Sequence, residues 1–210
     1  AFLSGKRRQP LGKEEPSVKK SLFVSRLDVL TLAVMGMLAA VAVMLVIAIH
    51  FPIIPLVGFI EFDLADVPVL IGSFLYGPLP GLVILLVVSL IQAFLLGGNG
   101  WVGLVMHFVA SGAMVMVASL IYRSRPSSKR LVVGLVCGAL SMTLLMIPMN
   151  LTLTVHGFGV PFDVVVSLLV PGIIPANLIK AGVNCLLAGL LFKALMPFLR
   201  RNKHFMHMQG

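Results

Sequence analysis

Charged residues are scarce in this sequence: Asp, Glu, Lys and Arg together make up 11% of its 210 residues. Soluble domains carry about 25% charged residues, because polar side chains must cover their water-exposed surface. Hydrophobic residues make up 59% of the chain, which leaves too little polar surface for a water-soluble globule. The composition therefore predicts an integral membrane protein without a sizeable soluble domain.

Cysteine is rarer still, and signatures of enzyme chemistry are missing. The two cysteines, Cys137 and Cys185, lie inside apolar runs and fit neither a disulfide framework nor a zinc site. The sequence has no GxxxxGK[ST] phosphate-binding loop and no Ser/His/Asp catalytic signature. Asp63 and Asp66 lie three residues apart, as helix-capping carboxylates do. We therefore expect neither an enzyme nor a metal site, and a transporter would need energy from a partner.

Continuous apolar runs fill most of the chain. A membrane-spanning helix needs about 20 apolar residues, whereas membrane β-strands alternate over segments of about ten. The runs here do not alternate, so we predict an all-α integral membrane fold with six transmembrane helices. The second and third segments are shorter than a bilayer requires, so they form either tilted spans or a re-entrant pair. The predicted segments are 30–49, 64–76, 82–96, 102–122, 131–153 and 173–195, with a long outer loop over 154–172.

The basic residues determine the predicted orientation. Of 16 Lys and Arg residues, seven precede the first segment, four lie between the fourth and fifth, and four lie at or beyond the end of the sixth. Lys and Arg are enriched in cytoplasmic loops, so we predict that both termini are cytoplasmic. The expected domains are a basic cytoplasmic tail over 1–27, a six-helix membrane domain over 28–199 and a second cytoplasmic tail over 200–210.

The acidic residues agree with this orientation. Glu61, Asp63, Asp66 and Asp163 lie in or beside the predicted outer loops, which contain no Lys or Arg. The net charge of +9 does not indicate nucleic-acid binding, because the basic residues flank apolar segments. They are explained as topology signals that also contact anionic membrane lipid.

Lys180 is the one basic residue inside a predicted span. A charge in the middle of a membrane helix costs at least about 2.5–3.5 kcal/mol on insertion scales and is usually functional. Asn177 and Asn184 share its helix face, and Asn150 is a further polar group in the fifth segment. Two interpretations stay open: a cavity near the outer side that binds a polar solute, or a lysine that snorkels outward or pairs with Asp163.

Small residues recur in the first segment, and aromatic residues recur in the outer loops. Ala33, Gly36 and Ala40 permit close approach of another helix, either within the chain or in a partner membrane subunit. Phe59 and Phe62 are suited to stacking on a flat ring, but they equally suit an anchoring role at the membrane interface.

Two motifs carry a resemblance to a known family. The runs FDLADVP (62–68) and FLYGPLPG (74–81), followed by LGG (96–98), resemble the riboflavin-type substrate-binding (S) subunits of energy-coupling factor (ECF) transporters. The run NLIK (177–180) is similar to the sixth-helix motif of that family. The resemblance covers roughly residues 33–198, and the FDLxDVP block is its most specific part.

The resemblance implies a vitamin-capture subunit of an ECF-type ABC importer in a prokaryotic cell membrane. In that family the S subunit associates with a transmembrane coupling subunit and two cytoplasmic ATPase subunits. Ala33, Gly36 and Ala40 would face the coupling subunit. Riboflavin would be the transported ligand, with no other cofactor, bound near the outer surface. The expected substrate-binding residues are Asn150, Asn177, Lys180, Asn184, Phe59, Phe62 and Asp63.

Alternative functions remain at this point. One is an S subunit for another vitamin or for a modified-purine precursor, because the third segment reads LVVSLIQ (86–92) where family members often carry a lysine or another polar residue. The other is a stand-alone small-solute transporter, which predicts inverted repeats with matching broken helices. The sequence contains no such repeats.

Overall fold

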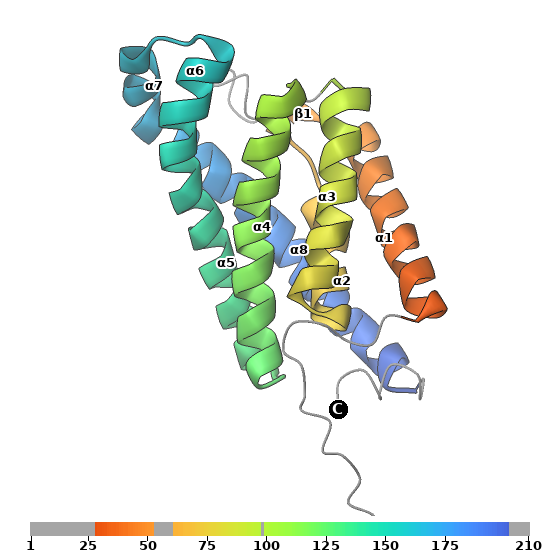
Figure 1. Ribbon diagram of the computed structural model, residues 1–210. Coiled ribbons are helices and arrows are strands. Elements are labelled where there is room, and N and C mark those ends of the chain that lie inside the picture. Colours follow the sequence, from red (N-terminus) through yellow and green to blue (C-terminus); the bar gives the residue numbers. More distant parts are fainter. Residues whose placement is uncertain (1–27, 53–60, 98, 202–210) are drawn as a thin grey trace, which may run out of the picture.

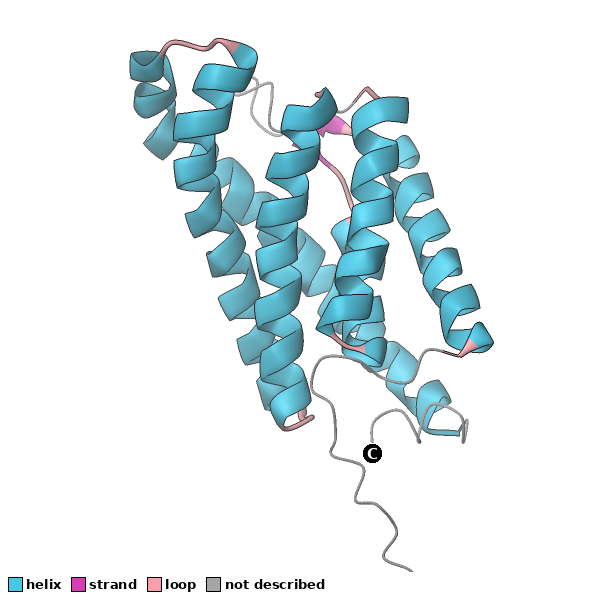
Figure 2. Cartoon of the chain, viewed as in Figure 1, coloured by secondary structure: helices cyan, strands magenta, loops and turns pink. Residues whose placement is uncertain are grey.

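The computed structural model describes residues 28–52, 61–97 and 99–201, and these form a bundle of helices (Figures 1 and 2). Five of the helices, counted with their outer extensions, are long and apolar enough to span a membrane, and a sixth is shorter. This confirms the predicted six-helix, all-α membrane fold. The principal helices are α1 (Val29–Ala48), α2 (Asp66–Tyr76), α3 (Pro78–Leu95), α4 (Gly100–Ser124), α5 (Ser128–Met149) and α8 (Ile174–Arg201).

The second helix occupies only half the height of the bundle. Its 11 residues correspond to about 16 Å at 1.5 Å per residue, and every one of them is buried. A single residue, Gly77 with φ 116°, joins α2 to α3 in a tight hairpin. The short second segment is therefore a half-length helix inside the bundle, whose N-terminus lies midway between the two ends (Figure 1).

A two-stranded ribbon lies at one end of the bundle, between α1 and α2. Strand β1 (Phe51–Pro52) pairs antiparallel with β2 (Glu61–Phe62), and Phe51 faces Phe62 with ring centroids 5.3 Å apart. Residues 61–65 then lead down from the ribbon to the start of α2. This descending segment carries Asp63 into the space above the half-length helix.

The expectation of a long outer loop over 154–172 is wrong. Helix α5 continues through the π-helical turn η2 (Asn150–Thr154) into α6 (Val155–Phe158). Helix α8 is preceded by α7 (Phe162–Leu168) and the π-helical turn η3 (Leu169–Ile173). Gly159, with φ 70°, opens the short turn between them. Pro148 and Pro171 lie beside or inside the π-helical turns, where a widened helix accommodates a lost hydrogen bond.

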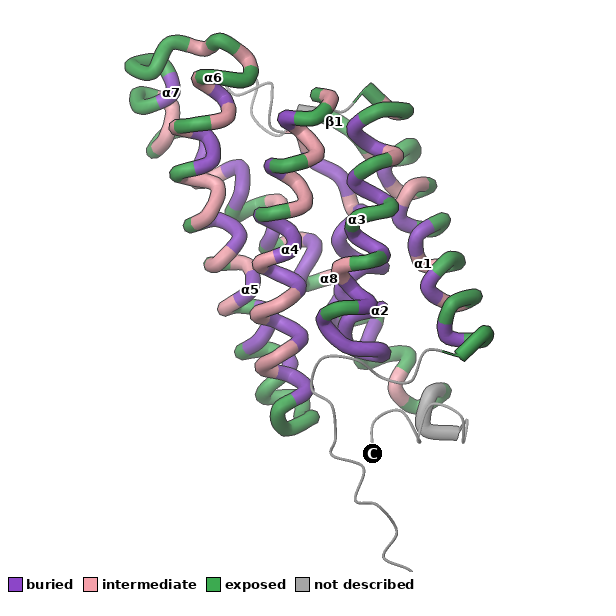
Figure 3. Tube along the Cα trace, viewed as in Figure 1, coloured by how far each residue is buried: buried purple, intermediate pink, exposed green. Residues whose placement is uncertain are grey.

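The distribution of burial is that of a membrane bundle. Buried positions line the helix faces that point inward, while many exposed positions on the outer faces are apolar (Figure 3). Helices α4 and α5 approach each other closely at Gly134, where an added Cβ would lie 2.7 Å from the carbonyl oxygen of Ala118. An aromatic cluster of Phe74, Tyr122 and Phe192 fills one end of the core, with ring centroids 5.1–5.4 Å apart.

Charge separates the two ends of the bundle. The start of α1, the α4–α5 connection and the end of α8 share one end (Figure 1). Arg125 lies in that connection, and Lys129 and Arg130 lie in the first turn of α5. Glu61 and Asp163 belong to the opposite end. The basic end is cytoplasmic by the positive-inside rule, which places the β1–β2 ribbon outside. The domain limits at 27 and 200 stay predictions, since 1–27 and 202–210 lie outside the described residues.

Candidate ligand-binding site

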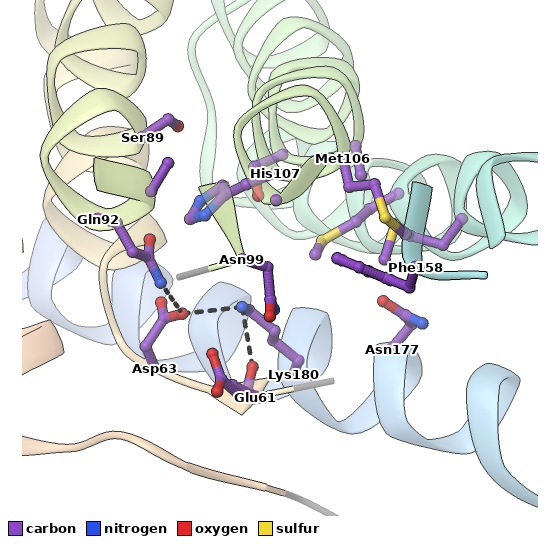
Figure 4. A pocket seen from close by; sticks show the side chains of 16 residues that line it. Glu61, Asp63, Ser89, Gln92, Asn99, Met106, His107, Phe158, Asn177 and Lys180 are labelled. Carbon is purple, nitrogen blue, oxygen red and sulfur yellow. Dashed lines mark hydrogen bonds and ion pairs between the residues drawn. The ribbon is translucent and has the colours of Figure 1, made fainter. Parts of the chain in front are cut away.

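A cavity opens at the outer end of the bundle, above the N-terminus of α2. Strand β2, the segment after it and helices α3, α4, α5, α6 and α8 contribute its walls (Figure 4). The half-length α2 leaves this space unfilled, so side chains from distant segments converge there. The lining residues are Glu61, Asp63, Ser89, Gln92, Ala93, Asn99, Gly103, Met106, His107, Ala110, Ser111, Met142, Met146, Phe158, Asn177 and Lys180.

A buried ion pair forms one side of the cavity. Lys180 Nζ lies 2.9 Å from Asp63 Oδ2 and donates a second hydrogen bond to the Glu61 carbonyl oxygen at 3.0 Å (Figure 4). The alternative pairing of Lys180 with Asp163 is wrong, because Asp163 is an exposed residue of α7. An ammonium group has three protons to donate, so Lys180 keeps one beyond these two bonds.

The environment of Asp63 keeps its carboxyl group ionised. Its side chain is fully buried, and burial alone would raise the pKa. The Lys180 ammonium, together with hydrogen bonds from Lys180 and the Ala65 amide, instead holds the pKa of Asp63 well below its usual range. Gln92 Nε2 also donates to Asp63 Oδ2 at 3.1 Å, and Asn184 Nδ2 donates to the Asp63 carbonyl oxygen at 2.9 Å. The ribbon is thereby tied to α3 and α8.

Several buried polar atoms of the cavity wall lack a hydrogen-bond partner among the described residues. They are Ser89 Oγ, Gln92 Oε1, His107 Nε2 and Asn177 Oδ1. Asn177 uses its Nδ2 to donate to the Ile173 carbonyl oxygen at 2.8 Å, which leaves the amide oxygen unsatisfied. Buried polar groups in folded proteins are almost always hydrogen-bonded, and leaving one unpaired costs about 1–3 kcal/mol. Their convergence on one cavity is therefore typical of a site that pairs them with a polar ligand.

The opposite wall is apolar. Met106 of α4, Met142 and Met146 of α5 and Phe158 of α6 line it. Methionine side chains are flexible and polarizable, and sulfur contacts with aromatic rings are favourable. Apolar walls with a few placed polar groups are the usual composition of small-molecule sites. The cavity thus suits a flat, partly polar molecule with an apolar face.

The sequence-predicted site residues divide into three groups. Asp63, Asn177 and Lys180 line the cavity. Asn150, Asn184 and Phe62 are buried beside it without lining it: Asn150 Nδ2 donates to the Met146 carbonyl oxygen, and Thr154 Oγ1 donates to Asn150 Oδ1. Phe59 lies outside the described residues.

The contribution of α3 and α4 to the cavity was not predicted from the sequence. Ser89 and Gln92 are the only polar residues over 86–92, and their spacing of three places both on one helix face. His107 is a polar residue in the middle of an apolar helix. Polar groups inside a membrane segment are costly and usually face the bundle interior, so this signal was present in the sequence. The sequence did not show which residues of other helices these polar side chains would lie against.

The small residues of α1 lie on an open surface. Ala33, Gly36 and Ala40 are all exposed, and a Cβ added at Gly36 would meet no atom within 4 Å. On the same helix Met35, Ala39 and Ala42 face the core. The face that bears Ala33, Gly36 and Ala40 is therefore not used for packing within the described part of the chain.

Comparison with known proteins agrees with this architecture. Residues 30–192 match the family described as ECF transporter, substrate-specific component. The chain is 32% identical over 176 residues to the riboflavin transporter RibU of Staphylococcus aureus (strain TCH60), covering 81% of this chain and 92% of that protein. It is 28% identical over 181 residues to the riboflavin transporter FmnP of Bacillus subtilis (strain 168), covering 82% and 95%.

A solved structure has the same fold. It is described as "Structure and mechanism of the S component of a bacterial ECF transporter", is 31% identical in sequence and superposes with a TM-score of 0.71 over 80% of this chain and 96% of that chain. The family match over residues 30–192 includes the helices that build the cavity. This multi-pass membrane protein, a transport protein and not an enzyme, belongs to the family of substrate-specific (S) components of ECF transporters.

Proposed function

We propose that this S component captures riboflavin at the outer face of the membrane. The observation that carries the proposal is the convergence of unpaired polar atoms from α3 and α8 on a cavity whose other wall is apolar. Riboflavin has a flat ring system with a polar pyrimidine edge, which matches such a division. The proteins named as riboflavin transporters, at about 30% identity over most of the chain, support the same ligand.

The proposed contacts follow the geometry of the cavity. Asn177 and Lys180 would hydrogen-bond the polar edge of the flavin, with Asp63 holding Lys180 in place. The methionines and Phe158 would cover the ring faces. We propose that a layer of buried residues supports the lining from behind: Asn150, Asn184 and Phe62. Phe59 belongs to the segment between the two strands. Binding needs no covalent step.

The partners are proposed from family membership. An S component associates with an ECF module, and we propose that this module consists of a transmembrane coupling subunit and two cytoplasmic ATPase subunits. Ala33, Gly36 and Ala40 would pack against the coupling subunit, since small residues let membrane helices approach closely. ATP hydrolysis by the partners would then drive release of the ligand into the cell.

The absorbance spectrum of detergent-purified protein tests the ligand. Cells grown in rich medium should yield protein with flavin bands in near-stoichiometric amounts, released on denaturation. A colourless protein that also fails to quench the fluorescence of added riboflavin would reject the flavin assignment. The alternative of another vitamin or a modified-purine precursor would then be examined by thermal-shift screening of those compounds.

A further inference from the structure

Two amide side chains of the cavity wall are held in a fixed orientation. Gln92 of α3 donates from Nε2 to Asp63 Oδ2 at 3.1 Å, and Asn177 of α8 donates from Nδ2 to the Ile173 carbonyl oxygen at 2.8 Å. Carboxylate and carbonyl oxygens only accept hydrogen bonds, so turning either amide over would set two acceptors against each other. Gln92 Oε1 and Asn177 Oδ1 are therefore fixed as acceptors.

Both amide oxygens need a donor from the ligand. They are unpaired within residues 28–52, 61–97 and 99–201, both side chains line the cavity, and only 8% of Gln92 and 1% of Asn177 are exposed. A ligand that fills the cavity without pairing such an acceptor incurs the cost of an unsatisfied buried group. The other polar atoms adapt more easily: Lys180 keeps a proton to donate, and Ser89 Oγ and His107 Nε2 can each donate or accept. A ligand that fits should therefore bring two separate donors.

The flavin ring supplies only one of these donors. The oxidised ring system carries a single N–H group, at N3, and its other polar atoms only accept. Figure 4 shows Gln92 and Asn177 on opposite sides of the cavity, so one N–H group cannot pair with both. The remaining donors of riboflavin are the hydroxyl groups of its polyol tail, and one of the two amide oxygens must therefore bind the tail.

The positions of the neighbouring polar groups assign the tail to α3. Lys180, a donor, lies three residues after Asn177, an acceptor, on one face of α8. The N3–H group of the flavin lies beside a carbonyl oxygen and presents the complementary pair, so Asn177 takes the donor of the ring and Gln92 is left for the tail. Ser89 lies three residues before Gln92 on one face of α3, and its unpaired Oγ can bind a neighbouring hydroxyl group.

Resting on the proposed function, we infer that Gln92 and Ser89 are specificity-determining residues that bind hydroxyl groups of the polyol tail, Gln92 through Oε1 and Ser89 through Oγ. The cavity would thus divide the ligand between two helices: α8 binds the polar edge of the ring, and α3 binds the tail. A flavin without tail hydroxyls leaves Gln92 Oε1 unpaired and should bind more weakly than riboflavin.

Two flavins separate tail contacts from ring contacts. Lumiflavin shares the ring system of riboflavin but carries a methyl group in place of the polyol tail. Fluorescence quenching of both flavins by purified protein gives the riboflavin preference, defined as the Kd of lumiflavin divided by the Kd of riboflavin. Gln92→Met removes the amide at similar side-chain length and should lower this preference about three- to tenfold. Loss of the hydrogen bond to Asp63 should weaken both flavins alike and leave the preference unchanged.

Three further variants complete the test. Ser89→Ala removes a hydroxyl group for which the described segments contain no partner, so it should also lower the preference while the Kd of lumiflavin stays within about twofold. Asn177→Ala is the contrasting change, because it should weaken both flavins by the same factor. Ser167→Ala is the control, since Ser167 is exposed on α7, and it should alter neither affinity.

Four outcomes would overturn the inference. A preference within about twofold of the original in Gln92→Met would mean that Gln92 only supports Asp63. A preference lost in Asn177→Ala instead would place the tail against α8. If Gln92→Met does not fold, judged by gel filtration, an unchanged preference in Ser89→Ala would still reject tail binding by α3. Unaltered protein that binds both flavins equally tightly would contradict any tail contact, whereas failure to bind either flavin would instead reject the proposed function.

Discussion

Asp63 and Lys180 are 117 positions apart in the sequence, yet they form one buried ion pair. The pair is not isolated, because Gln92 and the Ala65 amide also donate to the Asp63 carboxylate. Desolvation of two charges opposes such a pair, and good geometry with further hydrogen bonds offsets the cost. Removing one partner should therefore be worse for the fold than replacing both.

This asymmetry gives a stability prediction. Lys180→Met leaves the Asp63 carboxylate buried and unpaired, which typically costs about 3–5 kcal/mol. The double change Asp63→Asn with Lys180→Met leaves no buried charge and should recover part of that loss. The measurement is the thermal unfolding midpoint in detergent without ligand, with Lys193→Met at the exposed cytoplasmic end as the control. A double variant as unstable as the single one would contradict the account.

A second prediction concerns two asparagines, Asn177 in the cavity wall and Asn150 behind it. Asn177→Ala removes an unpaired acceptor from the cavity wall and should weaken riboflavin binding about three- to tenfold. Asn150→Ala should weaken it as well, as the family resemblance predicts. Thr154→Val, which removes only the hydrogen bond from Thr154 to Asn150, is the control for Asn150. Equal losses from Asn150→Ala and Thr154→Val would mean that Asn150 acts through the η2 turn and not by touching the ligand.

The residues of the site differ in how readily they can be identified from the sequence alone. Lys180 was identifiable because a charge inside an apolar segment is expensive. Asp63 was identifiable from the family motif. Gln92 and His107 were not assigned to the site, because the acidic residues near them, Asp63 and Asp66, are brought there only by the position of the half-length α2. A single sequence contains no local pattern that reports such a tertiary arrangement.

At the scale of elements, close packing of α4 against α5 makes a prediction. A Cβ at Gly134 would lie 2.7 Å from the Ala118 carbonyl oxygen, which belongs to backbone and cannot move aside cheaply. Gly134→Ala should therefore destabilise the protein by about 1–3 kcal/mol, as overpacking does. Gly182→Ala is the matched control, since nothing lies within 4 Å of its Cβ position and alanine favours the helix. Equal unfolding midpoints for the two variants would contradict close packing at Gly134.

The elements differ in how well the sequence predicted them. The long spans followed from apolar runs, because the bilayer sets their length. The segment 154–172 was misassigned because Gly157, Gly159, Pro161 and Pro171 are typical of loops in soluble chains. In a membrane protein, unpaired backbone groups are so costly that the chain stays helical through η2 and η3 and turns only at 159–161. Proline is therefore weaker evidence for a loop in this membrane protein than in a soluble chain.

At the scale of the whole molecule, binding and transport should be separable. The ligand cavity lies at the outer end between α3, α4, α5 and α8. The exposed small-residue face of α1 lies on the surface of the bundle. A change on that face should therefore leave the cavity intact, and any effect on uptake would reflect contact with the partner subunits.

Gly36→Trp tests this separation. The new side chain would enter open space, so the riboflavin affinity of the purified variant should stay within about twofold of the original. Uptake of labelled riboflavin by whole cells should nevertheless fall to background, because a bulky residue prevents close approach of a partner helix. Two controls lie on the same helix. Val41→Trp, at an exposed position about 140° around the helix from Gly36, should spare both properties. Ala42→Trp, at a fully buried position, should abolish both. If Gly36→Trp abolished ligand binding as well, its face would pack inside the subunit, and the coupling subunit would have to dock elsewhere.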